Sequence, residues 1–236
     1  MNRRLSFALI LAAALSACGR QPDSGDPVAR GKADFQGLGC IKCHQIGGEG
    51  HAWGPDLTLV GFRKQPQWLD LWLKNPHAWN AKTIMPNFNL NDGTRADLVA
   101  YLSAQKGQAW AVYPWRTEAA KALPSVARGK LIFNMAGCVA CHGQDGFGGY
   151  PNNNVVGGMI PSLTNVSDGY GHADLHAKIQ NGVISMPADA SKPKPLIYMP
   201  KWGDQLKPDE IDAVGDYLFS LKPKPAPGSA AASDDF

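Results

Sequence analysis

The chain has 236 residues, of which 44% are hydrophobic and 18% are charged. This apolar content can fill the cores of one or two domains, so a fully disordered chain is excluded. The formal net charge of +3 is too small to predict a nucleic-acid partner.

Residues 1–17 are predicted to form a signal peptide. Arg3 and Arg4 give a basic start, and residues 5–15 are apolar apart from Ser6. This apolar core is too short to span a bilayer, which takes about 20 residues. The pattern therefore predicts export of the mature chain.

The end of this segment resembles a bacterial lipobox. Small residues lead directly into Cys18 in the sequence "LSAC". We therefore expect Cys18 to be lipidated and residues 18–28 to form a tether, with the protein on the periplasmic side of a bacterial membrane that it does not span. The alternative is an ordinary signal peptide in which Cys18 is incidental.

An internal repeat begins after the tether. The sequence "ARGKADFQGLGCIKCH" (29–44) aligns without a gap with "ARGKLIFNMAGCVACH" (127–142). The second copy carries two insertions of about eight residues. The first lies in the Gly- and Asn-rich loop at 146–160, and the second lies in a loop rich in Lys and Pro that contains "KPKPLIY" (192–198). The repeat predicts two domains, 29–106 and 125–222, joined by a linker at 107–124.

Each copy predicts three helices around its motif. The first runs into a Gly-led turn, and the second is expected at 68–76 and at 174–182 from the helical spacing of apolar residues. A third helix follows, capped by Asp92 or Thr94 in the first copy and opened by Pro208 in the second. Residues 223–236 are rich in Pro and Ala, which predicts a disordered tail.

Both copies contain Cys-x-x-Cys-His, the attachment signal for c-type haem. Cys40 and Cys43, and likewise Cys138 and Cys141, are spaced to form thioethers to the vinyl groups of one haem, and His44 and His142 are then placed to bind the iron. The alternatives are a thioredoxin-like redox pair, which needs a βαβ setting, and a Cys₄ zinc site, which leaves both histidines unexplained.

Methionines in Met-Pro sequences are candidates for the sixth iron ligand. Met85 in "TIMPNFNL" and Met199 in "IYMPKWGDQL" have similar surroundings and precede the last helix of each copy. Met186 in "ISMPADA" competes with Met199, because its distance along the chain from His142 is closer to the spacing in the first copy.

These motifs together resemble class I cytochrome c, repeated in tandem. The resemblance implies a mainly α fold of two cytochrome c-like domains, each with a few helices around a covalent haem. It implies that Phe35 lies near Tyr101 and Phe133 near Tyr217, where the first and last helices cross. It also implies that the backbone carbonyls of Pro55 and Pro161 support the histidine ligands.

The resemblance predicts two covalently bound haem c groups with His/Met ligation, which leaves no open iron position. We therefore expect an electron carrier without enzymatic activity, anchored in the membrane by lipid and working between a donor and an acceptor redox protein. The alternatives are a dihaem enzyme of the peroxidase or thiosulfate-oxidising type, or a haem subunit of a larger dehydrogenase or oxidase. Nothing in the sequence indicates an oligomeric state.

Overall fold

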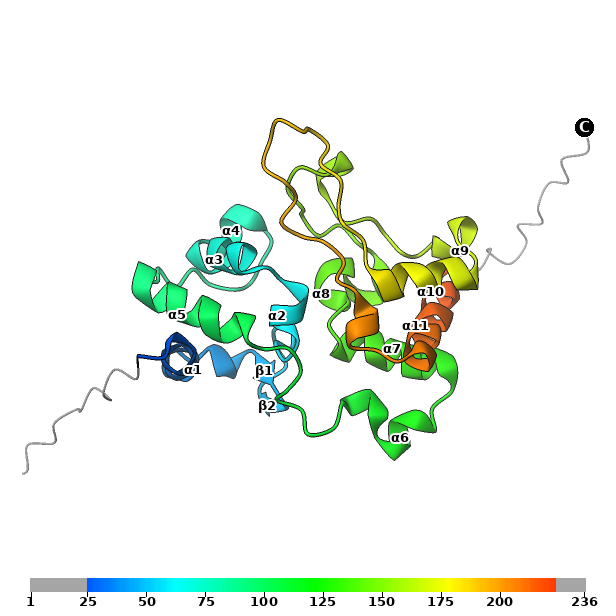
Figure 1. The fold of residues 1–236 in the computed structure, drawn as a ribbon, viewed down its shortest axis with the longest axis horizontal. Coiled ribbons are helices and arrows are strands. Elements are labelled where there is room, and N and C mark those ends of the chain that lie inside the picture. Colours follow the sequence, from blue (N-terminus) through cyan, green and yellow to red (C-terminus); the bar gives the residue numbers. More distant parts are fainter. Residues whose placement is uncertain (1–24, 224–236) are drawn as a thin grey trace, which may run out of the picture.

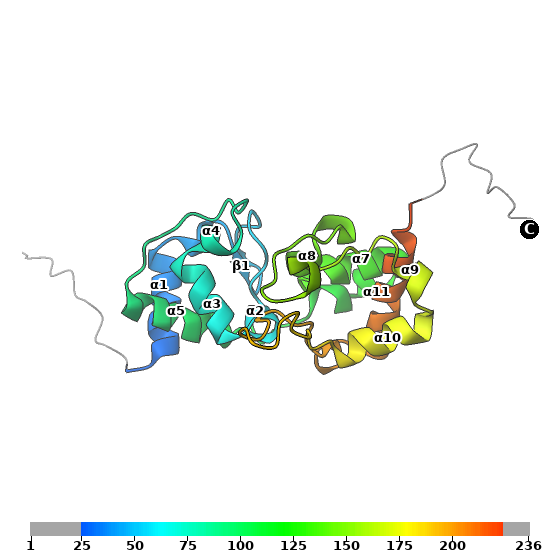
Figure 2. The same cartoon turned by 90° about the horizontal axis from the view of Figure 1, so that it is seen from above.

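The computed structural model describes residues 25–223, which form two helical lobes. The lobes lie side by side in both views (Figures 1 and 2). The predicted mainly α fold of two tandem domains is confirmed, and the lobes are called domain 1 and domain 2 below. The predicted signal peptide, Cys18, most of the tether and nearly all of the tail lie outside the described residues.

The two domains place their long helices at equivalent points of the repeat. Domain 1 contains α1 (Pro27–Gly37), α2 (Val60–Arg63), α3 (Pro66–Lys74), α4 (Pro76–Trp79) and α5 (Asp92–Ser103), with a short antiparallel pair, β1 (Gln45–Ile46) and β2 (Glu49–Gly50). α6 (Glu118–Lys121) lies between the domains in sequence. Domain 2 contains α7 (Ser125–Met135), α8 (Val139–His142), α9 (Val166–Gly169), α10 (His172–Asn181) and α11 (Pro208–Ser220).

The first and last helices of each domain cross in contact at a glycine. A Cβ atom at Gly31 would lie 2.0 Å from the carbonyl oxygen of Asp97 on α5. A Cβ atom at Gly129 would lie 1.8 Å from the carbonyl oxygen of Ala213 on α11. Only glycine allows the backbones to approach this closely, so the repeated Gly fixes the same crossing in both domains.

An aromatic pair packs beside each crossing. The ring centroids of Phe35 and Tyr101 are 5.6 Å apart, and those of Phe133 and Tyr217 are 5.4 Å apart. Such tilted or edge-on contacts are favourable between aromatic rings. The two contacts expected from the resemblance are confirmed.

The starts of two helices differ from the prediction. Asn91, in extended backbone, caps α5 and accepts a hydrogen bond from the amide of Thr94 at 2.9 Å. The prediction of Asp92 or Thr94 as the cap is wrong, because both already lie within the helix, whereas a cap residue has non-helical backbone. α1 begins at Pro27, so the last two residues of the predicted tether are helical.

The two insertions of domain 2 are joined to each other by three consecutive asparagines. The side-chain amides of Asn152, Asn153 and Asn154 donate to backbone carbonyls of the second insertion, at Ile197 (3.0 Å), Lys194 (3.0 Å) and Asp189 (2.9 Å) respectively. The two loops rise together at the top of Figure 1. The asparagines therefore give a shared shape to loops that contain little regular secondary structure.

The base of these loops packs against domain 1. Ile197 is 3% exposed and belongs to the same apolar cluster as Trp68 and Leu69 of α3. The indole of Trp79 donates to the carbonyl of Pro151 at 3.1 Å. The insertions are thus part of the contact between the domains.

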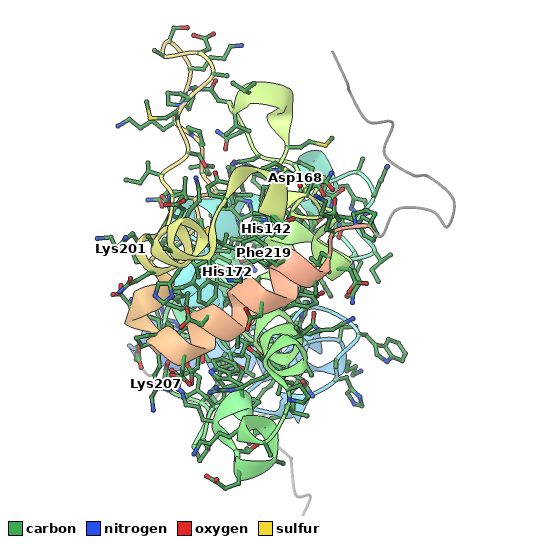
Figure 3. All side chains as sticks on the ribbon, turned by 90° about the vertical axis from the view of Figure 1, so that its right-hand side faces the viewer. His142, Asp168, His172, Lys201, Lys207 and Phe219 are labelled. Carbon is green, nitrogen blue, oxygen red and sulfur yellow. The ribbon has the colours of Figure 1, made fainter. Side chains whose placement is uncertain are left out.

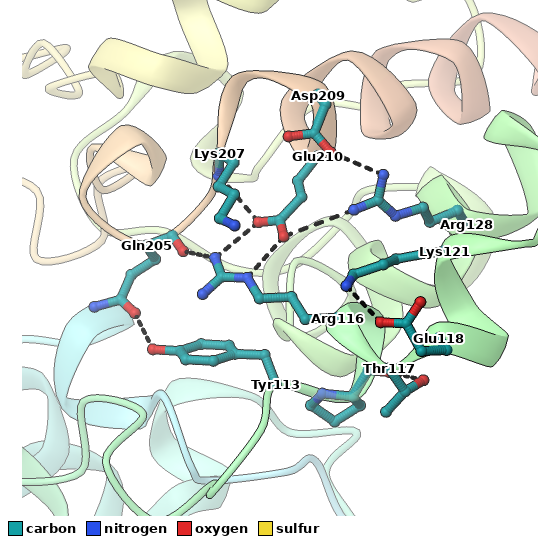
Figure 4. Close-up of polar contacts among 11 residues, drawn as sticks. Tyr113, Arg116, Thr117, Glu118, Lys121, Arg128, Gln205, Lys207, Asp209 and Glu210 are labelled. Atoms are coloured by element: carbon teal, nitrogen blue, oxygen red, sulfur yellow. Dashed lines mark hydrogen bonds and ion pairs between the residues drawn. The ribbon is translucent and has the colours of Figure 1, made fainter.

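The predicted linker is bound to domain 2 at a buried ion pair. Trp115 is fully buried, and the Arg116 guanidinium donates to both carboxylate oxygens of Glu210 at 2.7 and 2.8 Å (Figure 4). Arg116 also donates to the carbonyl of Gln205 at 2.7 Å. Because Glu210 is 0% exposed, its charge depends on Arg116 and on Arg128, whose guanidinium lies 3.7 Å away. Within residues 25–223, no helix combines the length and the hydrophobicity that crossing a bilayer requires.

Candidate haem sites

The first Cys-x-x-Cys-His motif folds into a tight helical turn after α1. Gly39 adopts the left-handed conformation (φ 77°) that lets the chain reverse there, and Cys40–Lys42 form a 3₁₀ turn. The amide of His44 donates to the carbonyl of Cys40 at 3.0 Å. The turn therefore brings both cysteines and the histidine into one short segment, as attachment of a single haem requires.

His44 is held by the Pro-x-Leu-Thr loop. Its Nδ1 lies 2.9 Å from the carbonyl oxygen of Pro55, and Gly54 has no side chain that would collide with the ring, since a Cβ there would lie 2.5 Å from it. Burial lowers the pKa of His44, against smaller opposing effects of Pro55 and Asp56. The contact expected for Pro55 is confirmed; it leaves Nε2 as the nitrogen for a metal and favours the neutral ring that metal binding needs.

Met85 lies on the apolar cluster of domain 1. Its sulfur accepts a hydrogen bond from the indole of Trp72 at 2.9 Å. Trp72 stacks on Trp68 with the ring centroids 5.1 Å apart, and Trp68 belongs to the same helix. The sequence indicated Met85 as a ligand candidate; the donor on its sulfur is a feature that the sequence did not reveal.

The second motif opens into a cavity of about 670 Å³. Gly137 is left-handed (φ 85°), and α8 carries the motif as one helical turn. Cys138, Cys141 and His142 line the cavity together with Met199. This volume lies within the range of about 300–1,000 Å³ that is usual for cofactor pockets. The residues present therefore fit a covalently attached haem.

His142 differs from His44 in its hydrogen bonding. Its Nδ1 is buried without a hydrogen-bond partner among the described residues. The expectation that the Pro161 carbonyl supports it is wrong: this carbonyl lies against Gly148, where a Cβ would approach it to 2.7 Å. The first insertion lies between His142 and Pro161 in the chain, so Pro161 is not presented as Pro55 is.

Burial and a nearby cation keep His142 neutral. Burial lowers its pKa to about 4, with a smaller contribution from the charge of Lys64. Burial also raises the pKa of the Cys138 thiol to about 12. The imidazole is thus in the neutral form that binds iron. Figure 3 shows His142 within the lobe, whereas Lys201 lies at its edge.

The two candidate methionines of domain 2 lie at different depths. Met199 is half-buried and is fixed by paired backbone hydrogen bonds with Val183 at 2.9 and 3.0 Å. Met186 also lines the cavity, but 78% of its surface is exposed. Both remain candidates, and the geometry favours Met199, because its backbone is held in place beside the cavity.

Two cations of domain 1 reach the second motif. Arg63 lines the domain 2 cavity and donates to the carbonyl of Gly137 at 2.8 Å. Lys64 donates from Nζ to the sulfur of Cys141 at 3.3 Å. Neither residue was predicted from the sequence as part of a site. The available signal was that Arg63-Lys64 aligns with Gly169-Tyr170, so the second copy lacks this cationic pair.

A run of contacts joins the two sites. Trp72 bonds the Met85 sulfur, Trp68 stacks on Trp72, and Lys64 lies 4.2 Å above the Trp68 ring and bonds Cys141. The sixth-ligand candidate of domain 1 is thereby connected, side chain by side chain, to a haem-attachment residue of domain 2. The two sites share one packed interface.

Comparison with known proteins matches a family model described as "Cytochrome c" to two segments, residues 28–106 and 126–222. The chain is 29% identical over 86 residues to cytochrome c oxidase subunit 2 of Alkalihalophilus pseudofirmus, a match that covers 33% of this chain and 25% of that protein. It is 31% identical over 83 residues to a subunit of the nitric oxide reductase of Stutzerimonas stutzeri, covering 33% of this chain and 57% of that protein.

The chain therefore spans less than two thirds of the length of these curated relatives. A chain of the reducing HAO-like protein complex of Kuenenia stuttgartiensis is 16% identical, with a TM-score of 0.29 and coverage of 82% of this chain and 96% of that chain. A likeness at this TM-score carries no argument about fold or function.

Proposed function

The chain belongs to the cytochrome c family, and from this premise we propose that each domain holds one covalently attached haem and that the protein passes single electrons between redox partners. The observation that supports this proposal most directly is the domain 2 cavity, which is lined by both cysteines, by His142 and by Met199. Domain 1 offers the corresponding set in Cys40, Cys43, His44 and Met85.

A haem attached in this way supplies reversible one-electron chemistry at its iron. The protein residues set where that chemistry occurs and how easily. The histidines present neutral imidazoles, and the Met-Pro segments present thioethers, which favour reduced iron. A haem held by one of these histidines and one of these methionines would have no iron position left for a substrate, which supports a carrier over a dihaem enzyme.

The proposal places the carrier on the periplasmic side of a bacterial membrane, held by lipid on Cys18. The support is the sequence "LSAC" after a short apolar core. An exported chain also fits the motif, because its four attachment cysteines are all accounted for by haem rather than by disulfides. A donor and an acceptor in the cell envelope would exchange electrons with the two domains.

A second candidate is a haem subunit of a larger complex. The two curated relatives are named as subunits of an oxidase and of a reductase, which favours this candidate. In that case the paired insertions of domain 2 are the surface that a partner subunit would cover. Co-purification from the native membrane distinguishes the two: a stable stoichiometric partner identifies a subunit, and its absence identifies a free carrier.

The test is mass spectrometry and optical spectroscopy of the mature protein. We expect the mass of two haems, with Cys40→Ala/Cys43→Ala and Cys138→Ala/Cys141→Ala each removing one, and lipid on Cys18. The reduced protein should be low-spin and unreactive with CO and peroxide. Free thiols at the four cysteines would overturn the proposal, and a CO-binding haem would point instead to an enzyme.

A further inference from the structure

The strongest unassigned feature is the cationic pair, Arg63 and Lys64, which domain 1 inserts beside the haem-attachment turn of domain 2. The two residues follow each other at the end of α2 and are only 5% and 6% exposed. They reach different atoms of the same turn. One bonds the carbonyl of Gly137, just before the first attachment cysteine, and the other bonds the sulfur of Cys141.

Arg63 is fixed entirely by backbone carbonyls. It donates to Asp56 at 2.6 Å, to Gly137 at 2.8 Å and to Leu59 at 3.3 Å. Among the residues that the structure describes, it has no ion pair with a carboxylate. Its positive charge is therefore buried, and no carboxylate in contact neutralises it.

Gly137 shows how closely the guanidinium approaches the turn. A Cβ atom at this position would lie 2.2 Å from Nη1 of Arg63. The attachment turn of domain 2 thus has space for the arginine of domain 1 only because a glycine stands there. The left-handed backbone of Gly137 requires the same residue independently.

Lys64 is placed by aromatic rings as well as by the sulfur. Its Nζ lies 4.2 Å from the ring centroid of Trp68 and 5.1 Å from that of Tyr150. Trp68 comes from domain 1 and Tyr150 from the first insertion of domain 2. The amino group is therefore held between the two domains and next to the thioether position. Burial lowers its pKa from the usual range, and interaction with Cys141 opposes this.

We infer that Arg63 and Lys64 are positioning and tuning residues of the second haem, supplied by domain 1, and that they raise its reduction potential. This inference rests on the proposed function. A buried cation near a haem increases the cost of the additional positive charge of ferric iron, and the low dielectric of the interface strengthens the effect. A hydrogen bond to the attached sulfur acts in the same direction, because it withdraws electron density from the haem edge.

The pair also makes the second site dependent on docking of the domains. In the aligned positions of the second copy stand Gly169 and Tyr170, so no equivalent cations exist there to act on the first haem. Among the described residues, Lys64 contacts an attachment cysteine of the second motif alone, so its effect is expected at the second haem. It biases the distribution of a single electron toward the second haem, and it is complete only while α2 remains against domain 2.

The experiment is redox titration of the full-length dihaem protein and its Lys64→Met variant. We expect the equilibrium between oxidised and reduced second haem to shift toward the oxidised form by about tenfold, which is about 59 mV for one electron. The first haem should keep its potential. The two waves are assigned with the Cys138→Ala/Cys141→Ala variant, in which only the first remains.

Two further variants separate charge from packing. Lys64→Arg keeps a cationic donor and should keep the reduction potential of the second haem close to that of the unaltered protein. Lys74→Met removes an exposed lysine on the neighbouring helix and should leave both potentials unchanged. Arg63→Gln should lower the second potential as well; if that variant does not fold, the Lys64 series still decides. The thermal unfolding temperature of the Lys64→Met variant should not fall, since methionine fills the same buried space.

A second haem whose potential is unchanged in Lys64→Met, or a shift in the first haem instead, overturns the inference. Both outcomes leave the proposed function intact, because they require two haems to be present. Loss of covalent haem from the unaltered protein would overturn the proposed function itself, and the mass spectrum reports that separately.

Discussion

Domain 1 and domain 2 present the same Cys-x-x-Cys-His turn in different surroundings. In domain 1 the histidine is held by its own domain, through the Pro55 carbonyl. In domain 2 the corresponding nitrogen of His142 has no partner among the described residues, and support for the turn comes from Arg63 and Lys64 of the other domain. The comparison shows that the repeated motif gives both domains the same attachment residues, while the sequence outside the motif determines which residues contact each histidine and each turn.

The largest expected effect is loss of the sixth ligand, which tests whether the two domains use equivalent methionines. Met85→Ala should turn the first haem high-spin and lower its potential by on the order of 0.1 V, within the roughly 0.8 V that axial ligands span. Met199→Ala should do the same to the second haem. The measurements are optical and EPR spectra together with redox titration.

Met186→Ala is the matched control for this pair, because Met186 lines the same cavity but is 78% exposed. We expect it to leave both haems low-spin. If Met186→Ala turns the second haem high-spin and Met199→Ala does not, Met186 is the ligand. The two insertions have then shifted the ligand along the chain, and the similar surroundings of Met85 and Met199 do not identify it.

The parts that sequence could predict are those in which both copies obey the same constraint. Gly31 and Gly129, with their Phe and Tyr neighbours, meet at equivalent crossings because a helix pair at this distance tolerates no Cβ. Pro55 was predictable for the same reason. Its counterpart Pro161 was not, since the first insertion changes the path of the chain between His142 and that loop.

Contacts between the domains were beyond prediction from one sequence. Nothing in the local pattern of Arg63-Lys64 indicates that these side chains leave their own domain, because a basic pair after a loop is usually solvated. The same holds for Asn152 to Asn154, which have the pattern of loop residues and in fact bond across to the second insertion. Such contacts join segments far apart in the chain, and local periodicity carries no information about them.

The second prediction concerns stability and sharpens the contrast between the domains. Glu210 of α11 is fully buried against Arg116, whereas the equivalent position of α5 in domain 1 is Thr94. Glu210→Gln should leave the half-buried Arg116 guanidinium, whose side chain is 24% exposed, without its charged partner and destabilise domain 2 by about 1–3 kcal/mol. Chemical denaturation followed at the two haems should show the second domain unfolding earlier.

This stabilisation depends on pH in a definite direction. Burial raises the pKa of Glu210, but hydrogen bonding and attraction to Arg116 outweigh it and hold the pKa below the ordinary value of 4.5. The contribution is therefore present above about pH 4.5 and disappears as pH falls through the lowered value. The exposed pair Lys121–Glu118 is the control, and Lys121→Met should change the stability much less, because water screens an exposed ion pair.

The third prediction tests whether the two helix crossings are equivalent. Gly31→Ala and Gly129→Ala each force a Cβ against a backbone carbonyl, and each should destabilise its own domain by about 1–3 kcal/mol. Gly37 lies on the same helix as Gly31, and a Cβ there would have no atom within 4 Å. Gly37→Ala should therefore leave the stability of domain 1 nearly unchanged. Unequal losses at Gly31 and Gly129 would show that the domains do not share one packing solution.

The smallest expected effect lies at the sulfur of Met85 and distinguishes the first haem from the second. Trp72 donates to this sulfur at 2.9 Å, while the aligned residue in domain 2 is Lys178, which instead bonds the hydroxyl of Tyr170 at 2.7 Å. A thioether that accepts a hydrogen bond donates less electron density to ferric iron, so the bond raises the potential. Among the described residues, the sulfur of Met199 accepts no such bond, so the proposed first haem alone would have this support.

Trp72→Phe keeps an aromatic ring against Trp68 and removes the donor. A neutral hydrogen bond contributes about 1 kcal/mol, so the reduction potential of the first haem should fall by roughly 40 mV. The potential of the second haem should stay the same within experimental error. Trp79→Phe is the control, because it also loses an indole hydrogen bond, to the Pro151 carbonyl, but has no bond to Met85. If both variants lower both potentials alike, the change reflects loosened docking of the domains, and the sulfur contact has no separate influence on the first haem.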